Sequence, residues 1–297
     1  MRNFLWFSGA FFGAFVLCQF TTPVYASDHR ERGHNSERGD KERSGRKRSG
    51  KRGRGLNDEM RGAFIPKRAD TDSMDARGFF ETGLRPVYPD DLNCQKADSF
   101  FGDTTRGNGS VRSPWFYEGR HGGLDIPAKG IPIIAIADGE VIEKGAGSGD
   151  GIGGIKIVLR HSPEDTGLKF WTFTEYKHLE DESPLALNAK VKKGTKVGLA
   201  GNTGTTGGRA YGTDGHYHLH LSAWYNATGE VIETRRRMVP KDGYWLDPLA
   251  MMHGGPLEST TVRDLPSGQK QVRFAYTTSD GSTHPKGAKI VWPFMCR

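Results

Sequence analysis

Short runs of β-branched and aliphatic residues, separated by glycine-rich loops, are the feature that most restricts the fold of this chain. The runs are IPIIAIADGEVIEKG (Ile131–Gly145), IKIVLRH (Ile155–His161), LKFWTFTEYKH (Leu168–His178) and KVGLAG (Lys196–Gly201). The chain has 41 glycines in 297 residues, which favours turns and strand connections over long helices. We therefore predict a mainly antiparallel β domain. The Asp-Gly pair in the first run is typical of a β-hairpin turn.

The segment HYHLHL (His216–Leu221) places three histidines at alternate positions. Successive side chains of a strand point to opposite faces, so the three histidines and Ser222 would share one face. Tyr217 and the two leucines would share the other face, which suits a core. A histidine costs free energy to bury unless its ring nitrogens find partners. We interpret the histidine face as a candidate metal or proton-transfer site.

A metal needs further ligands, and the upstream segment RHGGLDIPAKG offers two. His121 and Asp125 are separated by three residues, of which two are glycine, so the backbone can bring both side chains toward one point. Neutral imidazole and carboxylate are typical zinc ligands, and three protein ligands with an open position are typical of catalytic sites. The chain has no cysteine cluster for a closed structural site, and neither of its long glycine-rich loops ends like a nucleotide-binding phosphate loop.

Three ordered motifs, HGGLD, EYKHL and HYHLHL, resemble the HxxxD, YxHL and HLH motifs of lysostaphin-type and LytM-type zinc metallopeptidases, which are peptidoglycan endopeptidases. Further stretches are similar to that family: DSFFGD, IPIIAIADGEVI and VKKGTKVGLAGNTGTTGG. The resemblance covers about residues 98–249. It implies a mainly β fold, with two antiparallel sheets that flank an open groove and one zinc ion at the floor of that groove.

The resemblance also implies roles for single residues. His121, Asp125 and His220 match the zinc ligands, while His178 and His218 match the catalytic histidines. One of these two would take a proton from water, and the other would stabilise the oxyanion or protonate the leaving amine; which does which stays open. Tyr176, of the same strand parity as His178, is a further candidate for substrate binding, with a packing role as the alternative. His216, which has no counterpart in the family, is a candidate for substrate binding as a rim residue near the groove, with a chemical role as the alternative.

The function implied is a zinc-dependent endopeptidase that hydrolyses peptide cross-links of bacterial peptidoglycan. The alternative is a catalytically silent wall-binding or activator module with the same fold. Because all five motif positions are filled, the sequence favours the enzyme. A monomer is expected.

The ends of the chain add a second group of expectations. Residues 1–26 combine Arg2, an apolar run and the small-residue site VYA, which predicts a signal peptide and a periplasmic or secreted protein. An uncleaved membrane anchor is the alternative. A disordered Arg/Gly/Ser-rich segment should follow, over residues 27–62.

Within that segment, RSGRKRSGKRGR (Arg43–Arg54) holds seven basic residues and no acid, which equals the formal net charge of +7 of the whole chain. The rest of the protein is therefore neutral in sum. Behind a signal peptide, we expect anionic envelope polymers or lipid headgroups as its partners rather than nucleic acid. A plain solvated linker is the alternative.

The remaining boundaries place a lead-in arm at residues 63–97, the peptidase domain at 98–250 and a C-terminal β-hairpin extension, packed on that domain, at 251–297. Once a signal peptide is removed, Cys94 and Cys296 are the two cysteines left. A pair of cysteines in an exported chain favours a disulfide, with two free thiols as the alternative.

Overall fold

The computed structural model describes residues 55–146, 153–205, 215–234, 237–255 and 257–297. The predicted signal peptide, most of the predicted disordered segment and parts of both long glycine-rich loops lie outside the described residues. No helix within the described ranges is long and apolar enough to cross a membrane.

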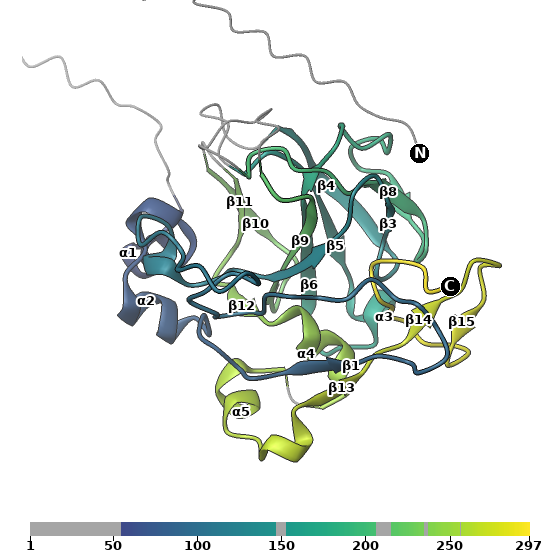
Figure 1. The fold of residues 1–297 in the computed structure, drawn as a ribbon. Coiled ribbons are helices and arrows are strands. Elements are labelled where there is room, and N and C mark those ends of the chain that lie inside the picture. Colours follow the sequence, from purple (N-terminus) through teal and green to yellow (C-terminus); the bar gives the residue numbers. More distant parts are fainter. Residues whose placement is uncertain (1–54, 147–152, 206–214, 235–236, 256) are drawn as a thin grey trace, which may run out of the picture. The chain divides into compact units, whose positions relative to one another are not determined.

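A central antiparallel sheet carries the fold (Figure 1). Its strands follow the order β12 (Tyr244–Leu246), β9 (His218–Asn226), β6 (Trp171–Leu179), β5 (Ile155–His161), β4 (Gly139–Ala146) and β7 (Lys190–Val191). The short strand β2 (Leu124–Pro127) pairs with the first half of β9, and β12 pairs with its second half. These strands coincide closely with the β-rich runs of the sequence, because alternating or continuous apolar residues suit a sheet that is buried on at least one face.

A second, two-stranded antiparallel sheet joins β3 (Pro132–Ile134) to β8 (Lys196–Leu199). The expected hairpin around Asp138 and Gly139 is wrong, because β3 and β4 belong to different sheets. Asp138 instead accepts a hydrogen bond from the backbone N–H of Lys193. The mainly β fold with antiparallel sheets is confirmed.

The central sheet is covered on both faces. One face packs into an apolar core that includes Leu219, Leu221 and Tyr176 together with Ile133 and Val197 of the second sheet. The other face packs against a second cluster in which Phe173 and Trp224 of the sheet meet residues of the N-terminal helices.

Two short helices, α1 (Asp58–Phe64) and α2 (Thr71–Ala76), supply that cover. Asn57 and Asp70 cap them by accepting hydrogen bonds from Met60 N and Ser73 N. Phe64 is fully buried against the ring of Trp245, with 5.4 Å between ring centroids. The predicted disordered segment therefore extends too far, since residues 58–62 are helical; the apolar residues of MRGAF provide the buried surface that the upstream tract lacks.

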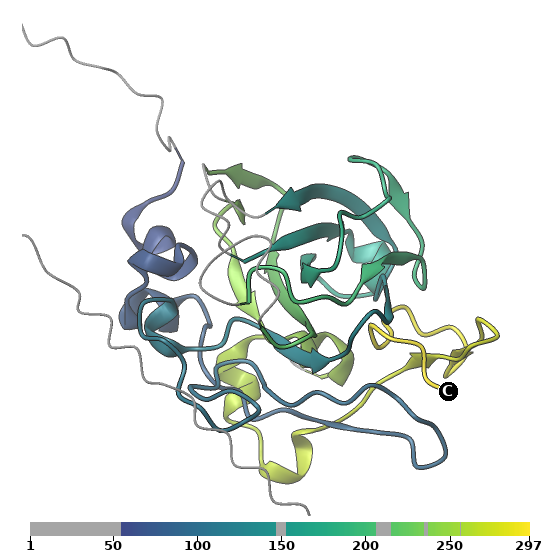
Figure 2. The ribbon, with the colours of Figure 1, turned by 45° about the horizontal axis from the view of Figure 1, so that its top comes forward.

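The other described elements are short. They are β1 (Arg85–Val87), β10 (Val231–Glu233), β11 (Met238–Pro240), β13 (Gln271–Arg273), β14 (Tyr276–Thr277), β15 (Thr283–His284), α3 (Pro163–Thr166), α4 (Pro248–His253), α5 (Ser259–Arg263) and the 3-10 turns Pro66–Arg68, Tyr117–Gly119 and Ser267–Gln269. Strand β13 pairs in parallel with β1, and β14 with β15 forms a hairpin. In both ribbon views (Figures 1 and 2) this hairpin and the helices α1 and α2 lie at opposite ends of the described body.

The last residues of the chain return to the main core. Trp292 and Phe294 are fully buried, and the indole N–H of Trp292 donates to the carbonyl of Gln95. A disulfide joins Cys94 to Cys296 across 202 residues, with 4.3 Å between their Cα atoms. The C-terminal segment is thus held by apolar contacts, hydrogen bonds and a covalent bond.

Candidate metal centre

Strands β2 and β9 bring three donor side chains together. Asp125 lies directly opposite His220 in the antiparallel register, so both side chains point to the same face of the sheet. His121 reaches the same point from the residues before β2. A Cβ at Gly123 would lie only 2.4 Å from the carbonyl oxygen of Leu221 and 3.0 Å from Nε2 of His220. Glycine is therefore required there for the backbone just before β2 to lie against β9.

The three donor atoms form a tight triangle. Nε2 of His121 lies 2.9 Å from Oδ1 of Asp125 and 3.1 Å from Nδ1 of His220, and the third side of the triangle is 2.8 Å. Tetrahedral zinc ligands at about 2.0–2.1 Å from the metal stand about 3.3 Å apart. A shift of a few tenths of an ångström would thus accommodate one ion. The set of two imidazoles and one carboxylate fits zinc.

Each donor is oriented by a second partner. Nδ1 of His121 donates to the carbonyl of Phe100 at 2.9 Å, which leaves Nε2 unprotonated as a ligand. Nε2 of His220 contacts Oγ of Ser222 at 2.9 Å. The guanidinium of Arg112 donates to Oδ2 of Asp125 at 3.1 Å. These contacts fix which nitrogen or oxygen is presented at the triangle.

Arg112 and Ser222 are positioning residues that the sequence did not reveal as such. Arg112 belongs to none of the motifs, and it lies in the loop between Phe101 and His121. Ser222 was expected on the histidine face, but its contact with the ring of His220 depends on side-chain geometry.

The surroundings also set the charge of the donors. Burial is the largest cause that lowers the pKa of His220, to about 3, and the charges of His121 and Lys177 act in the same direction. Burial alone would raise the pKa of Asp125, but His121 and His218 hold it well below its usual value. At neutral pH the site therefore offers a neutral imidazole and a carboxylate, which are the protonation states that bind metal.

His178 and His218 lie beside this triangle. The centroids of their rings are 4.7 Å apart, and the ring of His178 lies 5.8 Å from that of His220. Nδ1 of His178 donates to the carbonyl of Thr203 at 2.7 Å, and Nδ1 of His218 donates to the carbonyl of His216 at 2.9 Å. Each ring thus keeps Nε2 as the nitrogen that can accept or release a proton.

A bulge in β6 explains how His178 reaches the site. The register passes from Lys177 opposite Lys156 to Leu179 opposite Ile155, so His178 has no partner of its own on β5. Its φ of +64° is in the left-handed region. The bulge turns its side chain toward the metal triangle, although strict alternation would direct it with Tyr176.

The structure contradicts the substrate-binding role expected for Tyr176. Its side chain is fully buried in the main core, where its hydroxyl accepts a hydrogen bond from the N–H of Ile136 at 3.0 Å. The parity argument failed because of the bulge at His178. His216 is exposed and precedes β9, so the expected histidine face of the strand begins at His218 instead.

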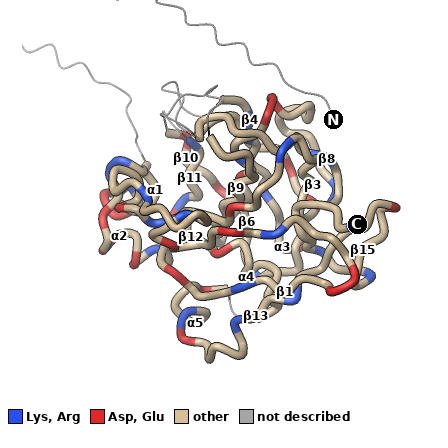
Figure 3. The backbone as a smooth tube through the Cα atoms, viewed as in Figure 1, with Lys and Arg blue, Asp and Glu red and all other residues tan. Residues whose placement is uncertain are grey.

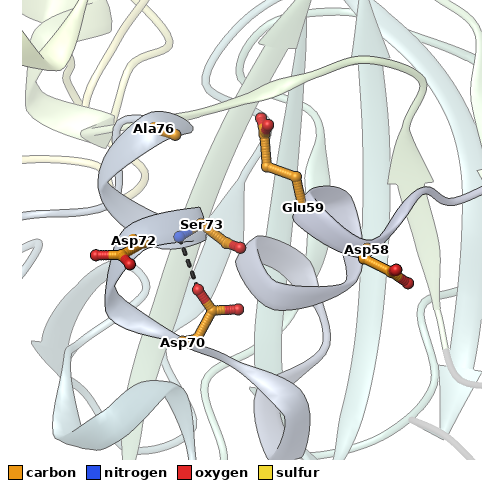
Figure 4. Close-up of a pocket in the computed structure, with 6 residues that line it drawn as sticks. All are labelled: Asp58, Glu59, Asp70, Asp72, Ser73 and Ala76. Atoms are coloured by element: carbon orange, nitrogen blue, oxygen red, sulfur yellow. Dashed lines mark hydrogen bonds between the residues drawn. The ribbon is translucent and has the colours of Figure 1, made fainter.

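A hollow between α1 and α2 is not part of this site (Figure 4). It is lined by Asp58, Glu59, Asp70, Asp72, Ser73 and Ala76. Three of its four carboxylates have structural partners: Asp58 pairs with Arg61, Glu59 pairs with Arg77, and Asp70 caps α2.

Two imidazoles and a carboxylate around one point, with two further histidines beside them, define a metallopeptidase-like centre. Residues 119–232 match the model of Peptidase family M23. This match confirms the resemblance found in the motifs of the sequence.

Individual relatives match over limited parts of their length. A protein of Haemophilus influenzae described as "Uncharacterized metalloprotease" is 37% identical over 103 residues, which are 34% of this chain and 19% of that relative. A solved structure, described as a putative glycyl-glycine endopeptidase lytM from Ruminococcus gnavus, is 26% identical, with a TM-score of 0.29. That match covers 39% of this chain and 42% of the other, and its TM-score is too low to establish a common fold. The chain thus spans about a fifth of the curated relative and less than half of the solved one.

Proposed function

We propose that this protein is a zinc-dependent endopeptidase that hydrolyses peptide cross-links of bacterial peptidoglycan. The observation that carries the proposal is the triangle of His121, Asp125 and His220, whose donor atoms lie 2.8–3.1 Å apart, with His178 and His218 beside it. Residues 119–232 match a peptidase family, which supports hydrolysis of a peptide bond as the reaction.

A zinc ion held by these three side chains would polarise the scissile carbonyl and make a water molecule more acidic. His178 and His218 perform the proton transfers. Because their Nδ1 atoms donate to backbone carbonyls, each ring is fixed in orientation and acts through Nε2. One ring removes the proton of the attacking water, and the other stabilises the oxyanion or gives a proton to the departing amine.

Peptidoglycan as substrate is supported by the motif resemblance, which is to peptidoglycan endopeptidases. The first 26 residues support export to the periplasm or the medium, where that polymer is located. The basic tract Arg43–Arg54 would bind anionic envelope polymers or lipid headgroups near the substrate.

The test is digestion of purified peptidoglycan, with mass spectrometry of the soluble products. We expect new amino termini within the cross-links, loss of cleavage on chelation and recovery with one equivalent of zinc. A zinc-loaded protein that binds the polymer without releasing products would contradict the proposal and support the silent wall-binding module instead.

A further inference from the structure

The two oxygens of Asp125 have separate partners. Oδ1 faces the metal triangle, at 2.9 Å from Nε2 of His121 and 2.8 Å from Nδ1 of His220, and Nε2 of His218 lies 3.6 Å from the same oxygen. Oδ2 accepts a hydrogen bond from the guanidinium of Arg112 at 3.1 Å, and within the described ranges no other arginine or lysine pairs with this carboxylate. The carboxylate thus presents one oxygen to the metal position and the other to a cation.

Arg112 is held by further contacts beside this ion pair. Its Nε donates to the carbonyl of Thr105 at 3.1 Å, and the nitrogen that contacts Asp125 also donates to Oγ of Ser99 at 2.6 Å. Its backbone N–H donates to the carbonyl of Thr104 at 3.0 Å. A planar guanidinium with five donors can make such a set of contacts at once. The position of the guanidinium is therefore set by the protein before any metal binds.

The contacts of Arg112 lie where a short loop, residues 104–112, closes on itself. Thr105 and Val111 form an antiparallel bridge within the loop, and Ser99 forms a second antiparallel bridge with Asp125. The loop and the metal ligand are thus joined twice, through the backbone of Ser99 and through the side chain of Arg112.

A carboxylate can bind a metal through one oxygen or through both. Bound through Oδ1 alone, Asp125 would complete a set of three protein donors and leave a coordination position open. Bound through both oxygens, it would fill that position. A turn of Oδ2 toward the metal would break its charge-assisted hydrogen bond to Arg112. Because the side chains of Arg112 and Asp125 are only 17% and 13% exposed, water would replace the lost partner only in part.

We propose that Arg112 is a positioning residue that restricts Asp125 to one metal-binding oxygen and so keeps a coordination position free for water and substrate. This inference rests on the proposed function, because it concerns the zinc centre of that endopeptidase. It gives the loop of residues 104–112, which carries none of the sequence motifs, a part in the reaction.

The test uses cobalt(II) in place of zinc, because its visible absorption is more intense in a tetrahedral site than in a site of higher coordination number. The wild-type protein should give the intense spectrum. Arg112→Met should lower the intensity several-fold at unchanged metal content, since Oδ2 then joins the metal. In the zinc form, kcat/KM for a small cross-link peptide should fall by about 10- to 100-fold, the usual cost of removing a partner of a metal ligand. Arg112→Lys retains the charge and should recover part of both losses.

Arg106→Met is the matched control. Arg106 is an exposed arginine of the same loop, and it donates to Ser110 and Val111 rather than to Asp125. The spectrum and the rate of this variant should match those of the wild type.

An Arg112→Met spectrum identical to that of the wild type would overturn the role of Arg112. A wild-type spectrum of higher coordination number would overturn it as well, even if Arg112→Met failed to fold. A wild-type protein with the tetrahedral spectrum and no hydrolysis of any cross-link peptide would contradict the proposed function alone.

Discussion

Asp125 is the residue at which the contacts of the centre meet. One of its oxygens faces both His121 and His220, and the other accepts from Arg112. Asp125→Ala or His220→Ala would leave two protein ligands, which hold zinc poorly. We expect both variants to lose bound zinc and peptidase activity, as measured by elemental analysis and peptide hydrolysis. Full activity in a zinc-free sample would contradict the centre as described.

Removal of either proposed proton-transfer residue, His178 or His218, should have a different effect. His178→Ala and His218→Ala retain all three donors, so zinc content should remain near that of the wild type. The rate should fall by about 10²- to 10⁴-fold, the usual contribution of a general acid or base. His216→Ala is the matched histidine control and should be mild in both assays. If His218→Ala lost zinc and His220→Ala kept it, the roles within HLH would be exchanged.

At the scale of single elements, helix α4 carries a titratable cap. Asp247 accepts the N–H of Leu249 and the hydroxyl of Thr82. Burial raises the pKa of Asp247 to about 6, although these two hydrogen bonds act to lower it. The folded state therefore holds a proton more tightly than the unfolded state, so this group's contribution to the free energy of unfolding falls as the pH rises from about 4 to 6.

Asp247→Asn keeps the acceptor for Leu249 and removes the charge. Above pH 6 we expect the variant to exceed the wild type in free energy of unfolding by up to about 3 kcal/mol, and below pH 4 the difference should shrink. Urea unfolding of metal-free samples between pH 4 and 8 measures both. Parallel pH profiles for the two proteins would contradict a raised pKa at this cap.

Side-chain orientation within one strand could be predicted from the sequence, whereas the pairing between strands could not. Alternation in HLHLSA placed His218, His220 and Ser222 on one face of β9, because the period of a strand is a local property. The bulge at His178 could not be read from EYKHL, since it depends on the register between two strands, and it reversed the prediction for Tyr176. Strand β3 pairs with β8, which lies far along the chain, and not with β4. The hairpin predicted from the Asp-Gly pair was therefore wrong, because strand pairing depends on contacts that a local turn signal does not determine. Arg112 reaches Asp125 through the path of a loop that no motif marks.

At the scale of the whole molecule, the disulfide between Cys94 and Cys296 closes a loop of about 200 residues. In the chain-entropy model such a bond stabilises by up to about 5 kcal/mol, and often by less. Reduction should lower the melting temperature and increase protease cleavage after residue 250, while zinc content stays constant, because neither cysteine belongs to the metal centre. Non-reducing peptide mapping checks the bond itself, and two alkylatable thiols in native protein would refute it.

The basic tract should act independently of catalysis. Over the described residues, acidic and basic residues are interspersed along the backbone (Figure 3), whereas Arg43–Arg54 contains seven cations and no acid. Deletion of Asp28–Gly55 should leave hydrolysis of a small peptide unchanged and weaken binding to anionic wall or membrane preparations, most clearly at low salt. If neither binding nor its salt dependence changed, this tract would be a plain linker.

Trp245 lies outside the segment matched to the peptidase family, and so do four of the aromatic residues that contact its ring: Phe64, Phe79, Phe101 and Tyr117. Its indole N–H donates to the carbonyl of Ala63, and its ring stacks on Phe79 at 4.3 Å. The same sheet that carries the metal donors thus depends on sequence from both flanks for its cover. A gene fragment trimmed to residues 119–232 would keep β3 and β8 but lose the cover over Phe173 and Trp224, and the exposed apolar surface would favour aggregation. In this protein the flanks and the peptidase segment therefore form one compact unit, and a fragment made for expression has to include both flanks.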